Sequence, residues 1–197
     1  MAENIHPIFE SILKKGDKES LLNQRGIVIW LVGLSGSGKS TIARGLENKL
    51  HREKVLTQIL DGDNLRSGLN HDLGFTDGER VENIRRTAEV ARLFANCGVV
   101  TLCSFITPTE EIRKLAREII GEDYFEVYVR CSLEECEARD VKGLYKKARD
   151  GGIPGFTGID SPFEEPLDPQ LILDTKKEDI ENSVENLYRV VVDRIKK

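Results

Sequence analysis

The chain has 197 residues, a length that fits one domain with a sizeable core better than two domains. Its 29 basic and 34 acidic residues give a net charge of −5, which argues against bulk binding of nucleic acid or of a membrane surface. Any anionic ligand must therefore be held by a local cluster of cations. The first residues show no signal pattern and no apolar run approaches membrane-spanning length, so we expect a soluble, cytoplasmic protein.

Residues 1–24 carry apolar side chains at helical spacing, interrupted by charges. This pattern predicts an amphipathic N-terminal helix that packs on the domain or on a partner subunit. The extension carries no visible chemistry. The chain therefore divides into an extension over 1–24 and one domain over 25–197. The apolar positions are Ile5, Ile8, Phe9, Ile12 and Leu13.

A phosphate-binding pattern, G-x-x-x-x-G-K-[ST], spans residues 33–40. An unbroken apolar run over 27–32 precedes it and predicts a buried strand, while 41–50 has the apolar spacing of a helix. Three glycines let backbone N–H groups point at an anion, and the positive end of the helix adds to them. The loop alone does not distinguish a kinase from a GTPase or a motor. The nucleotide-binding residues expected are Gly33, Leu34, Ser35, Gly36, Ser37, Gly38, Lys39, Ser40 and Thr41.

Within this loop, Lys39 is expected to reach the β- and γ-phosphates, and the Ser40 hydroxyl is expected on Mg²⁺. Asp61 and Asp63 directly follow the second predicted strand. One carboxylate can hold the water shell of Mg²⁺ while the other points at the acceptor hydroxyl. An ordinary Asp-Gly turn is the alternative, but the neighbouring phosphate loop favours the functional interpretation.

The remaining segments alternate between apolar strands and amphipathic helices. This alternation predicts an α/β fold, a parallel sheet covered by helices on both faces. Ligands of such sheets bind beyond the carboxyl ends of the strands, so the loops there should form one crevice. Strands are predicted over 55–60, 99–104, 124–129 and 171–173, helices over 79–96, 108–120, 133–149 and 178–195, and irregular substrate-facing segments over 64–78 and 150–170.

Cations gather where the acceptor should bind. Arg66, Arg80, Arg85 and Arg86 could clamp an anionic acceptor, although a solvated helix face competes as an explanation for the last two. Residues 139–149 hold five cations in eleven residues and could close over the reacting groups as a mobile lid. Nucleic-acid binding is disfavoured there because the chain is acidic and no aromatic residues are interleaved.

Two aromatic residues, Phe75 and Phe156, lie among glycines and could stack on a base, although packing under a loop is the more common fate of a lone phenylalanine. The four cysteines lie in or next to apolar segments and form no C-x-x-C pair. Buried, reduced thiols are expected, rather than disulfides or a zinc site. The cysteines are Cys97, Cys103, Cys131 and Cys136.

Together these stretches resemble the ordered motifs of the adenylylsulfate kinase family over about residues 25–175. The resemblance implies a three-layer P-loop fold with a five-stranded parallel sheet, a lid and substrate loop over about 139–170, and a homodimer. It implies transfer of the ATP γ-phosphate to the 3′-hydroxyl of adenosine 5′-phosphosulfate (APS), with Mg²⁺, in sulfate activation, and a functional link to ATP sulfurylase. The motifs are the loop at 33–40, DGDNLR at 61–66, DLGF at 72–75, NIRR at 83–86, RDVKGLY at 139–145 and GFTGID at 155–160.

Carried over motif by motif, the resemblance assigns roles to individual residues. Asp63 would be the base or metal-linked carboxylate, with Asp61 beside it, and Arg149 with the lid would cover ATP. The acceptor would be held by Arg66, Arg80, Asn83 and Lys142, its adenine sandwiched by Phe75 and Phe156, and its site lined by the backbone at Ile106.

Two positions depart from the family pattern. Thr107 stands where a serine, sometimes described as a phosphorylated intermediate, is common; it keeps a hydroxyl, but the change favours direct in-line transfer. Phe163 stands where tyrosine is usual, which should keep the packing of the ring and lose any hydrogen bond of the phenol.

Other functions compete with this interpretation. A related phosphate-loop kinase could act on gluconate, shikimate or a nucleoside monophosphate. A guanine-nucleotide switch should carry Asn-Lys-x-Asp, but the stretch at 48–51 reads Asn-Lys-Leu-His. An interaction domain with a vestigial nucleotide site is disfavoured because Lys39 and both carboxylates are present.

Overall fold

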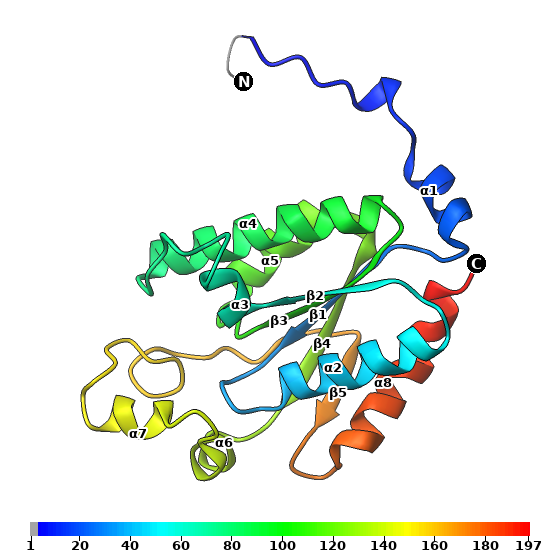
Figure 1. Cartoon of the computed structure of the whole chain (residues 1–197). Helices are drawn as coiled ribbons and strands as arrows, with labels where there is room; N and C mark the ends of the chain where they lie inside the picture. Colours follow the sequence, from blue (N-terminus) through cyan, green and yellow to red (C-terminus); the bar gives the residue numbers. More distant parts are fainter. Residues whose placement is uncertain (1–3) are drawn as a thin grey trace.

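Five parallel strands form the centre of the molecule, in the order β2-β3-β1-β4-β5 (Figure 1). A computed structural model describes residues 4–197. The strand order confirms the predicted parallel sheet, and all five predicted strands are present. Their bounds are β1 (Ile27–Val32), β2 (Thr57–Asp61), β3 (Val100–Phe105), β4 (Tyr124–Arg130) and β5 (Leu171–Asp174).

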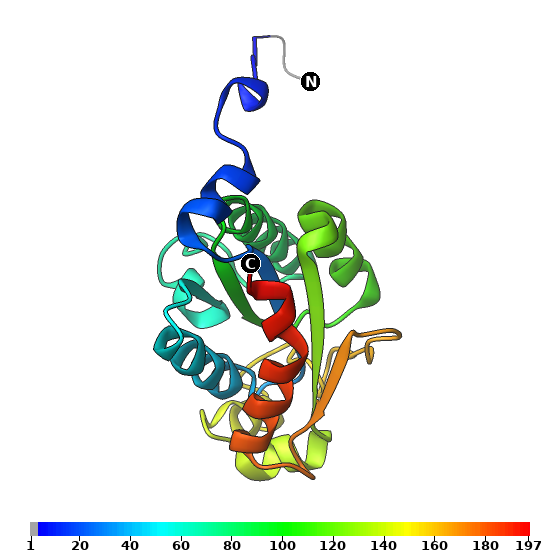
Figure 2. The ribbon, with the colours of Figure 1, turned by 90° about the vertical axis from the view of Figure 1, so that its right-hand side faces the viewer.

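Two layers of helices cover the sheet. Figures 1 and 2 show α2 (Lys39–Arg52) and α8 (Ile180–Ile195) on one face, and α4 (Asp77–Asn96) and α5 (Glu110–Ile120) on the other. This arrangement is the predicted three-layer α/β fold. The right-handed crossovers of such a fold place the loops after the strands at one edge of the sheet.

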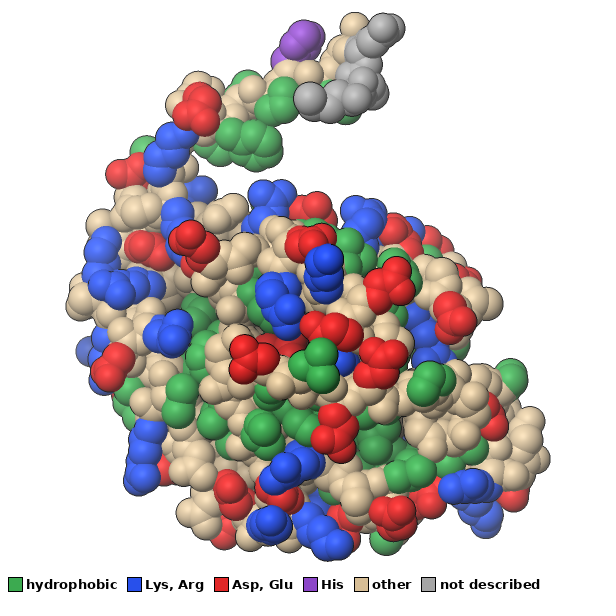
Figure 3. All heavy atoms as spheres, turned by 180° about the vertical axis from the view of Figure 1, so that it is seen from behind, with side chains coloured by type: hydrophobic (Ala, Val, Ile, Leu, Met, Phe, Trp, Pro, Cys, Tyr) green, Lys and Arg blue, Asp and Glu red, His purple; other side chains and the backbone are tan. Residues whose placement is uncertain are grey.

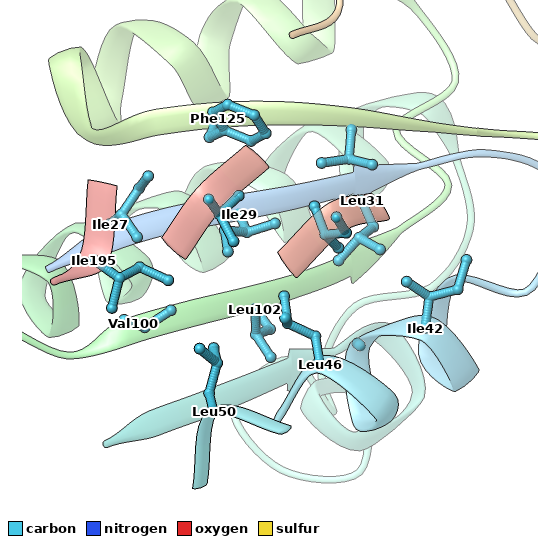
Figure 4. Packing of buried hydrophobic residues seen from close by; sticks show 14 of the residues in the cluster. Ile27, Ile29, Leu31, Ile42, Leu46, Leu50, Val100, Leu102, Phe125 and Ile195 are labelled. Carbon is cyan, nitrogen blue, oxygen red and sulfur yellow. The ribbon is translucent and has the colours of Figure 1, made fainter. Parts of the chain in front are cut away.

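The central strand, β1, shows why helices must pack on both faces of the sheet. All six residues of β1 are buried, and alternate side chains enter two separate hydrophobic clusters. Ile29 and Leu31 pack with the α2 and α8 layer (Figure 4), whereas Trp30 packs with the α4 and α5 layer. An unbroken apolar sequence was therefore the correct indication of a strand buried on both sides.

Beyond the carboxyl ends of the strands lie three short helices, α3 (Gly62–Arg66), α6 (Leu133–Arg139) and α7 (Leu144–Arg149) (Figure 1). One continuous helix over 133–149 was predicted, and this was wrong. The chain turns at 140–143, where Asp140 has φ 24° and Gly143 has φ 66°. The Asp140 carboxylate accepts hydrogen bonds from the N–H groups of Tyr145 (3.0 Å) and Lys146 (3.1 Å), which starts a second helix.

The segment predicted as irregular over 64–78 also contains the end of α3 and the start of α4. Helix α4 begins at Asp77 because Thr76 and Glu79 form a capping box, in which each side chain binds the backbone N–H of the other. The turns between the two helices span 67–76.

The N-terminal extension differs most from expectation. A helix was predicted over the extension 1–24, whose residues 1–3 lie outside the described part, but the structure has a 3₁₀ turn η1 (Phe9–Ser11) and a helix α1 (Lys15–Leu22). Helix α1 is tied to the body by ion pairing of Lys15 with Asp123. The arm before it projects from the body (Figures 1 and 3), and isolated short helices are marginal without a packed face. Its apolar side chains are exposed: Ile5, Ile8, Phe9, Ile12 and Leu13.

The cysteines follow the prediction with one exception. Cys103, Cys131 and Cys136 are buried free thiols, but Cys97 is exposed because it lies at the C-terminal end of α4. Among residues 4–197, no helix is both long and apolar enough to cross a membrane.

Candidate active site

The phosphate loop connects β1 to the N-terminus of α2. Gly36 and Gly38 have φ values of 76° and 107°, which side chains disfavour. A Cβ on Gly33 would lie 2.5 Å from the carbonyl oxygen of Val129, so only glycine fits there. The loop thus turns tightly over the end of the sheet and leaves the N-terminus of a 14-residue helix free to bind an anion.

Lys39 is the first residue of α2 and only 8% exposed. Its Nζ donates to the carbonyl oxygens of Gly33 (2.8 Å) and Leu34 (2.7 Å), inside the loop. Burial in this loop lowers the pKa of Lys39 to about 8. The ammonium is therefore held within the loop, and an anion bound there would favour its charged form.

A hydroxyl and a carboxylate meet next to the loop. The Ser40 Oγ donates to Asp61 Oδ2 (2.7 Å) and lies 3.0 Å from the Ser104 Oγ. The other oxygen of Asp61 accepts the Asp63 N–H (3.1 Å), which caps α3. Oxygen donors of this kind suit Mg²⁺. Sequence reasoning missed Ser104, although a polar residue near the end of an apolar strand was a visible signal.

Asp63 lies in α3 and faces the segment between α6 and α7, where its carboxylate forms an ion pair with Lys142. Their side chains are 72% and 54% exposed. The structure thus brings together two residues that sequence reasoning placed at the reacting hydroxyl and in the lid.

Arg66, at the end of α3, shapes the turn in front of α4. Its Nη1 donates to the carbonyl oxygens of Leu73 (2.9 Å) and Gly74 (2.7 Å). Its guanidinium also lies 4.3 Å from the centre of the Phe75 ring, a cation–π contact. Phe75 is held from one side in this way and remains 65% exposed.

Arg80 joins two loops that are far apart in the sequence. Its Nε donates to the Phe75 carbonyl oxygen (2.8 Å), its Nη1 to Thr157 Oγ1 (2.8 Å) and its Nη2 to the Gly155 carbonyl oxygen. Phe156 lies between Gly155 and Thr157 in the sequence. Its ring is buried and packs edge-on against Tyr145, with ring centres 5.0 Å apart. The two predicted stacking residues therefore lie on segments that one arginine connects, one ring exposed and the other buried.

The other two arginines of α4 are engaged in surface ion pairs. Arg85 and Arg86 both bind Glu82, and Arg86 also binds Asp72 through two hydrogen bonds of 2.7 and 2.9 Å. These ion pairs lower the pKa of Glu82 to about 2. This network is typical of a solvated helix face, the explanation that competed with a clamp.

Thr107 lies in the loop after β3 with φ 45° and is 2% exposed. Its Oγ1 accepts a hydrogen bond from Trp30 Nε1 (3.0 Å), and its carbonyl oxygen accepts one from Arg113 Nη1 (3.0 Å). The hydroxyl of this candidate catalytic residue is therefore directed into the protein. The preceding residue, Ile106, is half-buried.

The lid segment is fastened to the phosphate loop. The Tyr145 hydroxyl donates to the Ser35 carbonyl oxygen (2.9 Å), and burial raises the pKa of Tyr145. Arg149 pairs with Glu137, which joins α7 to α6 and leaves Arg149 57% exposed. Tyr145 was within a predicted motif but had no role assigned to it.

A second tie comes from the segment after β5. The Thr175 Oγ1 donates to the Ser37 carbonyl oxygen (2.9 Å), while the Thr175 carbonyl oxygen accepts from Arg139 Nη2 (2.8 Å). Thr175 therefore links the phosphate loop to α6, a role that its sequence position did not indicate.

Phe163 keeps its packing without a phenol, as expected. Its ring stacks on that of Tyr128 at 6.2 Å between centres. Phe163 and Leu34 line an open pocket of about 490 Å³, which none of the other predicted site residues lines.

The chain is similar to known proteins in both sequence and structure. A family model described as adenylylsulphate kinase matches residues 25–174. An adenylyl-sulfate kinase of Phocaeicola vulgatus is 56% identical over 191 residues, 96% of this chain and 94% of the relative. The Mycobacterium tuberculosis APS kinase solved in complex with AMPPNP and APS has a TM-score of 0.82 and 46% identity, over 85% of this chain and 98% of that one.

More distant structures share the fold alone. A shikimate kinase of Acinetobacter baumannii, solved in complex with shikimate, has a TM-score of 0.54 at 14% identity, over 89% of this chain and 98% of that one. This fold thus also occurs in a kinase with a different acceptor, and the acceptor must be identified from the residues around the site.

Proposed function

The chain belongs to the adenylylsulphate kinase family, and from this premise we propose which of its residues transfer the γ-phosphate of ATP to the 3′-hydroxyl of APS. The reaction forms 3′-phosphoadenylyl sulfate and ADP. The observation that carries the residue assignment is the Ser40–Asp61 hydrogen bond beside the phosphate loop, with Asp63 two residues further along the chain.

The nucleotide side of the site consists of the loop and the first turn of α2. Its backbone N–H groups would bind the phosphates of ATP, and Lys39 would move from the Gly33 and Leu34 carbonyl oxygens to the β- and γ-phosphates. Ser40 and Asp61 would hold Mg²⁺, which neutralises phosphate charge when bound. Thr41 is exposed beside Ser40 and could contact the same phosphates.

The acceptor side centres on Asp63. In the transfer, the 3′-oxygen forms a bond to the γ-phosphorus as the bond between that phosphorus and the β,γ-bridging oxygen breaks. The proton of the 3′-hydroxyl passes to the Asp63 carboxylate, and ADP leaves with the bridging oxygen. Lys142 must release Asp63 for this step and can then bind the anionic acceptor.

The remaining acceptor contacts come from the two loops that Arg80 connects. Arg66 and Arg80 supply guanidinium groups that suit phosphosulfate oxygens, and Asn83 supplies an amide one helical turn after Arg80. Phe75 and Phe156 would enclose the adenine, and the backbone at Ile106 would line the site. The hydrogen bonds of Arg80 to both loops support this assignment of the acceptor contacts.

The lid completes the site. Residues 139–170 would close over the substrates and exclude water, which would otherwise compete as the acceptor. Arg149 would cover ATP. Because the Thr107 hydroxyl is buried and accepts a hydrogen bond from Trp30, we assign it a positioning role and propose direct in-line transfer.

We further propose that residues 25–197 form the catalytic domain of a cytoplasmic homodimer, with ATP sulfurylase as the enzyme functionally linked to it. The exposed apolar side chains of residues 5–13 are consistent with a subunit contact. Sedimentation of the purified chain would measure its oligomeric state.

The deciding experiment offers the purified protein Mg-ATP with APS and follows ADP release. Shikimate, gluconate and AMP serve as control acceptors, and mass spectrometry identifies the product. We expect rapid ADP release with APS alone and a product heavier by one phosphoryl group. Turnover with a control acceptor and none with APS would contradict the assignment.

A further inference from the structure

A buried pair of amides lies behind the acceptor side of the site. Asn70, in the turn between α3 and α4, is fully buried. Its Nδ2 donates a hydrogen bond of 2.9 Å to the Oδ1 of Asn83 on α4. Asn70 lies between the motifs at 61–66 and 72–75 and belongs to neither, and the hydrogen bond spans thirteen positions of the sequence.

This contact determines which end of the Asn83 amide is available. Within residues 4–197, the Asn83 side chain forms only this hydrogen bond. The bond engages the amide oxygen of Asn83 and leaves its NH2 group available to a ligand. Asn83 follows Arg80 by three residues, so the two side chains lie on the same face of α4. The free donor therefore lies beside the guanidinium that joins the acceptor loops.

The backbone of Asn70 is fixed by its neighbours. Its N–H donates to the Leu65 carbonyl oxygen (2.8 Å), and its own carbonyl oxygen accepts from the Leu73 N–H (3.1 Å). Leu65 precedes Arg66 in α3, and Leu73 is a residue to which Arg66 donates. Asn70 is thus held in the same turn that Arg66 shapes.

One polar atom of Asn70 remains unexplained by packing. The Oδ1 is buried and has no hydrogen-bond partner within residues 4–197. A buried unpartnered oxygen destabilises the folded protein, and an apolar side chain would avoid that penalty. The amide at this position therefore needs another explanation, and its donation to Asn83 provides one.

We propose that Asn70 is a positioning residue, which holds the Asn83 amide so that its NH2 group, and not its oxygen, faces the acceptor. An NH2 donor attracts the phosphosulfate or hydroxyl oxygens of the acceptor, whereas a carbonyl oxygen at the same point would repel the anion. This inference rests on the proposed function of Asn83 in acceptor binding.

Two substitutions at this position separate orientation from packing. Asn70→Ala removes the tie and lets the Asn83 amide rotate, so the KM for APS should rise while the KM for ATP stays unchanged. Asn70→Asp supplies only acceptor oxygens when ionised, so it should bind the Asn83 NH2 and turn the Asn83 oxygen toward the acceptor. The KM for APS should therefore rise more in Asn70→Asp than in Asn70→Ala, by about tenfold or more.

A double-mutant cycle with Asn83→Ala tests the mechanism. Once the Asn83 amide is absent, Asn70→Ala should change the KM for APS no further, whereas independent effects would multiply. Thermal unfolding and AMPPNP binding of each variant report whether the fold and the nucleotide side are intact.

The outcomes distinguish the inference from its premise. An unchanged KM for APS in Asn83→Ala would refute the acceptor role of Asn83 itself. A raised KM in Asn83→Ala, with Asn70 variants that only lower the melting temperature or raise both KM values equally, would overturn the positioning role and leave the proposed function intact. Multiplicative effects in the cycle would also overturn it.

Discussion

Lys142 of the lid segment forms an ion pair with Asp63 of α3, so the carboxylate that we assign as the base is bound to a cation. Both side chains are more than half exposed, and pairs of this kind contribute only about 0–1 kcal/mol. The bound acceptor can therefore displace Lys142 at little cost. The ion pair joins the lid to the acceptor side, just as Tyr145 joins it to the phosphate loop.

The first prediction concerns Asp63. Asp63→Ala should lower kcat by at least about 10²-fold, because it removes the group that takes the proton of the 3′-hydroxyl. AMPPNP binding should persist, since the phosphate loop does not depend on this carboxylate. Steady-state kinetics and calorimetry measure the two effects.

Asp72 provides the matched control for this variant. It is another exposed aspartate that pairs with a cation, but its partner is Arg86, in the surface ion-pair network of α4. Asp72→Ala should leave kcat nearly unchanged. Near-normal kcat in Asp63→Ala would reject the role assigned to Asp63.

The second prediction concerns the protonation of Lys39. Burial lowers its pKa to about 8 in the free protein, and bound phosphates should raise it again. Nucleotide binding near pH 8.5 should therefore take up a proton, and affinity should fall as pH rises through 8. Calorimetry of AMPPNP binding in buffers of different ionisation enthalpy measures this uptake.

The same shift has the opposite effect on folding. Between pH 8 and the ordinary lysine value of 10.5, the unfolded chain binds more protons than the folded one, so the contribution of Lys39 to the free energy of unfolding rises with pH. Lys39→Arg is the control, because arginine keeps its proton throughout this range. Proton uptake of equal size in Lys39→Arg would show that another group titrates.

The sequence predicted the parts of this molecule that depend on local pattern. The apolar run of β1 and the glycines of the following turn are contiguous, and their order alone places an anion at the start of α2. Asp61 could be placed near Ser40 because Asp61 ends β2 and the loop that leads to Ser40 follows β1, so both lie at the carboxyl edge of one parallel sheet.

Contacts between distant segments could not be predicted in the same way. The hydrogen bond from Trp30 to Thr107 spans 77 positions, and that from Tyr145 to Ser35 spans 110. Nothing in a single sequence names such partners. The break at Asp140 was missed because the charged sequence over 133–149 is compatible with one long helix and also with two short ones. Two helices form because the Asp140 side chain caps the second helix, a contact that the sequence pattern does not reveal.

The third prediction concerns Arg80. Arg80→Ala should raise the KM for APS by about tenfold or more, because it removes a charged group from the acceptor and loosens both loops that it joins. The KM for ATP should change little. Initial rates with each substrate varied in turn give the two values.

Arg85 is the control on the same helix, since its guanidinium binds only Glu82 among residues 4–197, at the surface. Arg85→Ala should leave both KM values within about twofold, as expected when an exposed ion pair of about 0–1 kcal/mol is lost. An effect of Arg80→Ala confined to ATP would place Arg80 in the wrong half of the site.

The last prediction separates a positioning role of Thr107 from a phosphorylated intermediate. Thr107→Val leaves the buried Nε1–H of Trp30 without an acceptor, so the free energy of unfolding should fall by about 1–3 kcal/mol. Turnover at saturating substrates should stay within a few-fold, because direct transfer needs no hydroxyl here. Thr107→Ser keeps the hydroxyl and should recover most of the stability. If instead kcat collapsed in the valine variant alone, and mass spectrometry of the parent protein incubated with ATP found phosphate on Thr107, a two-step transfer would replace the direct one.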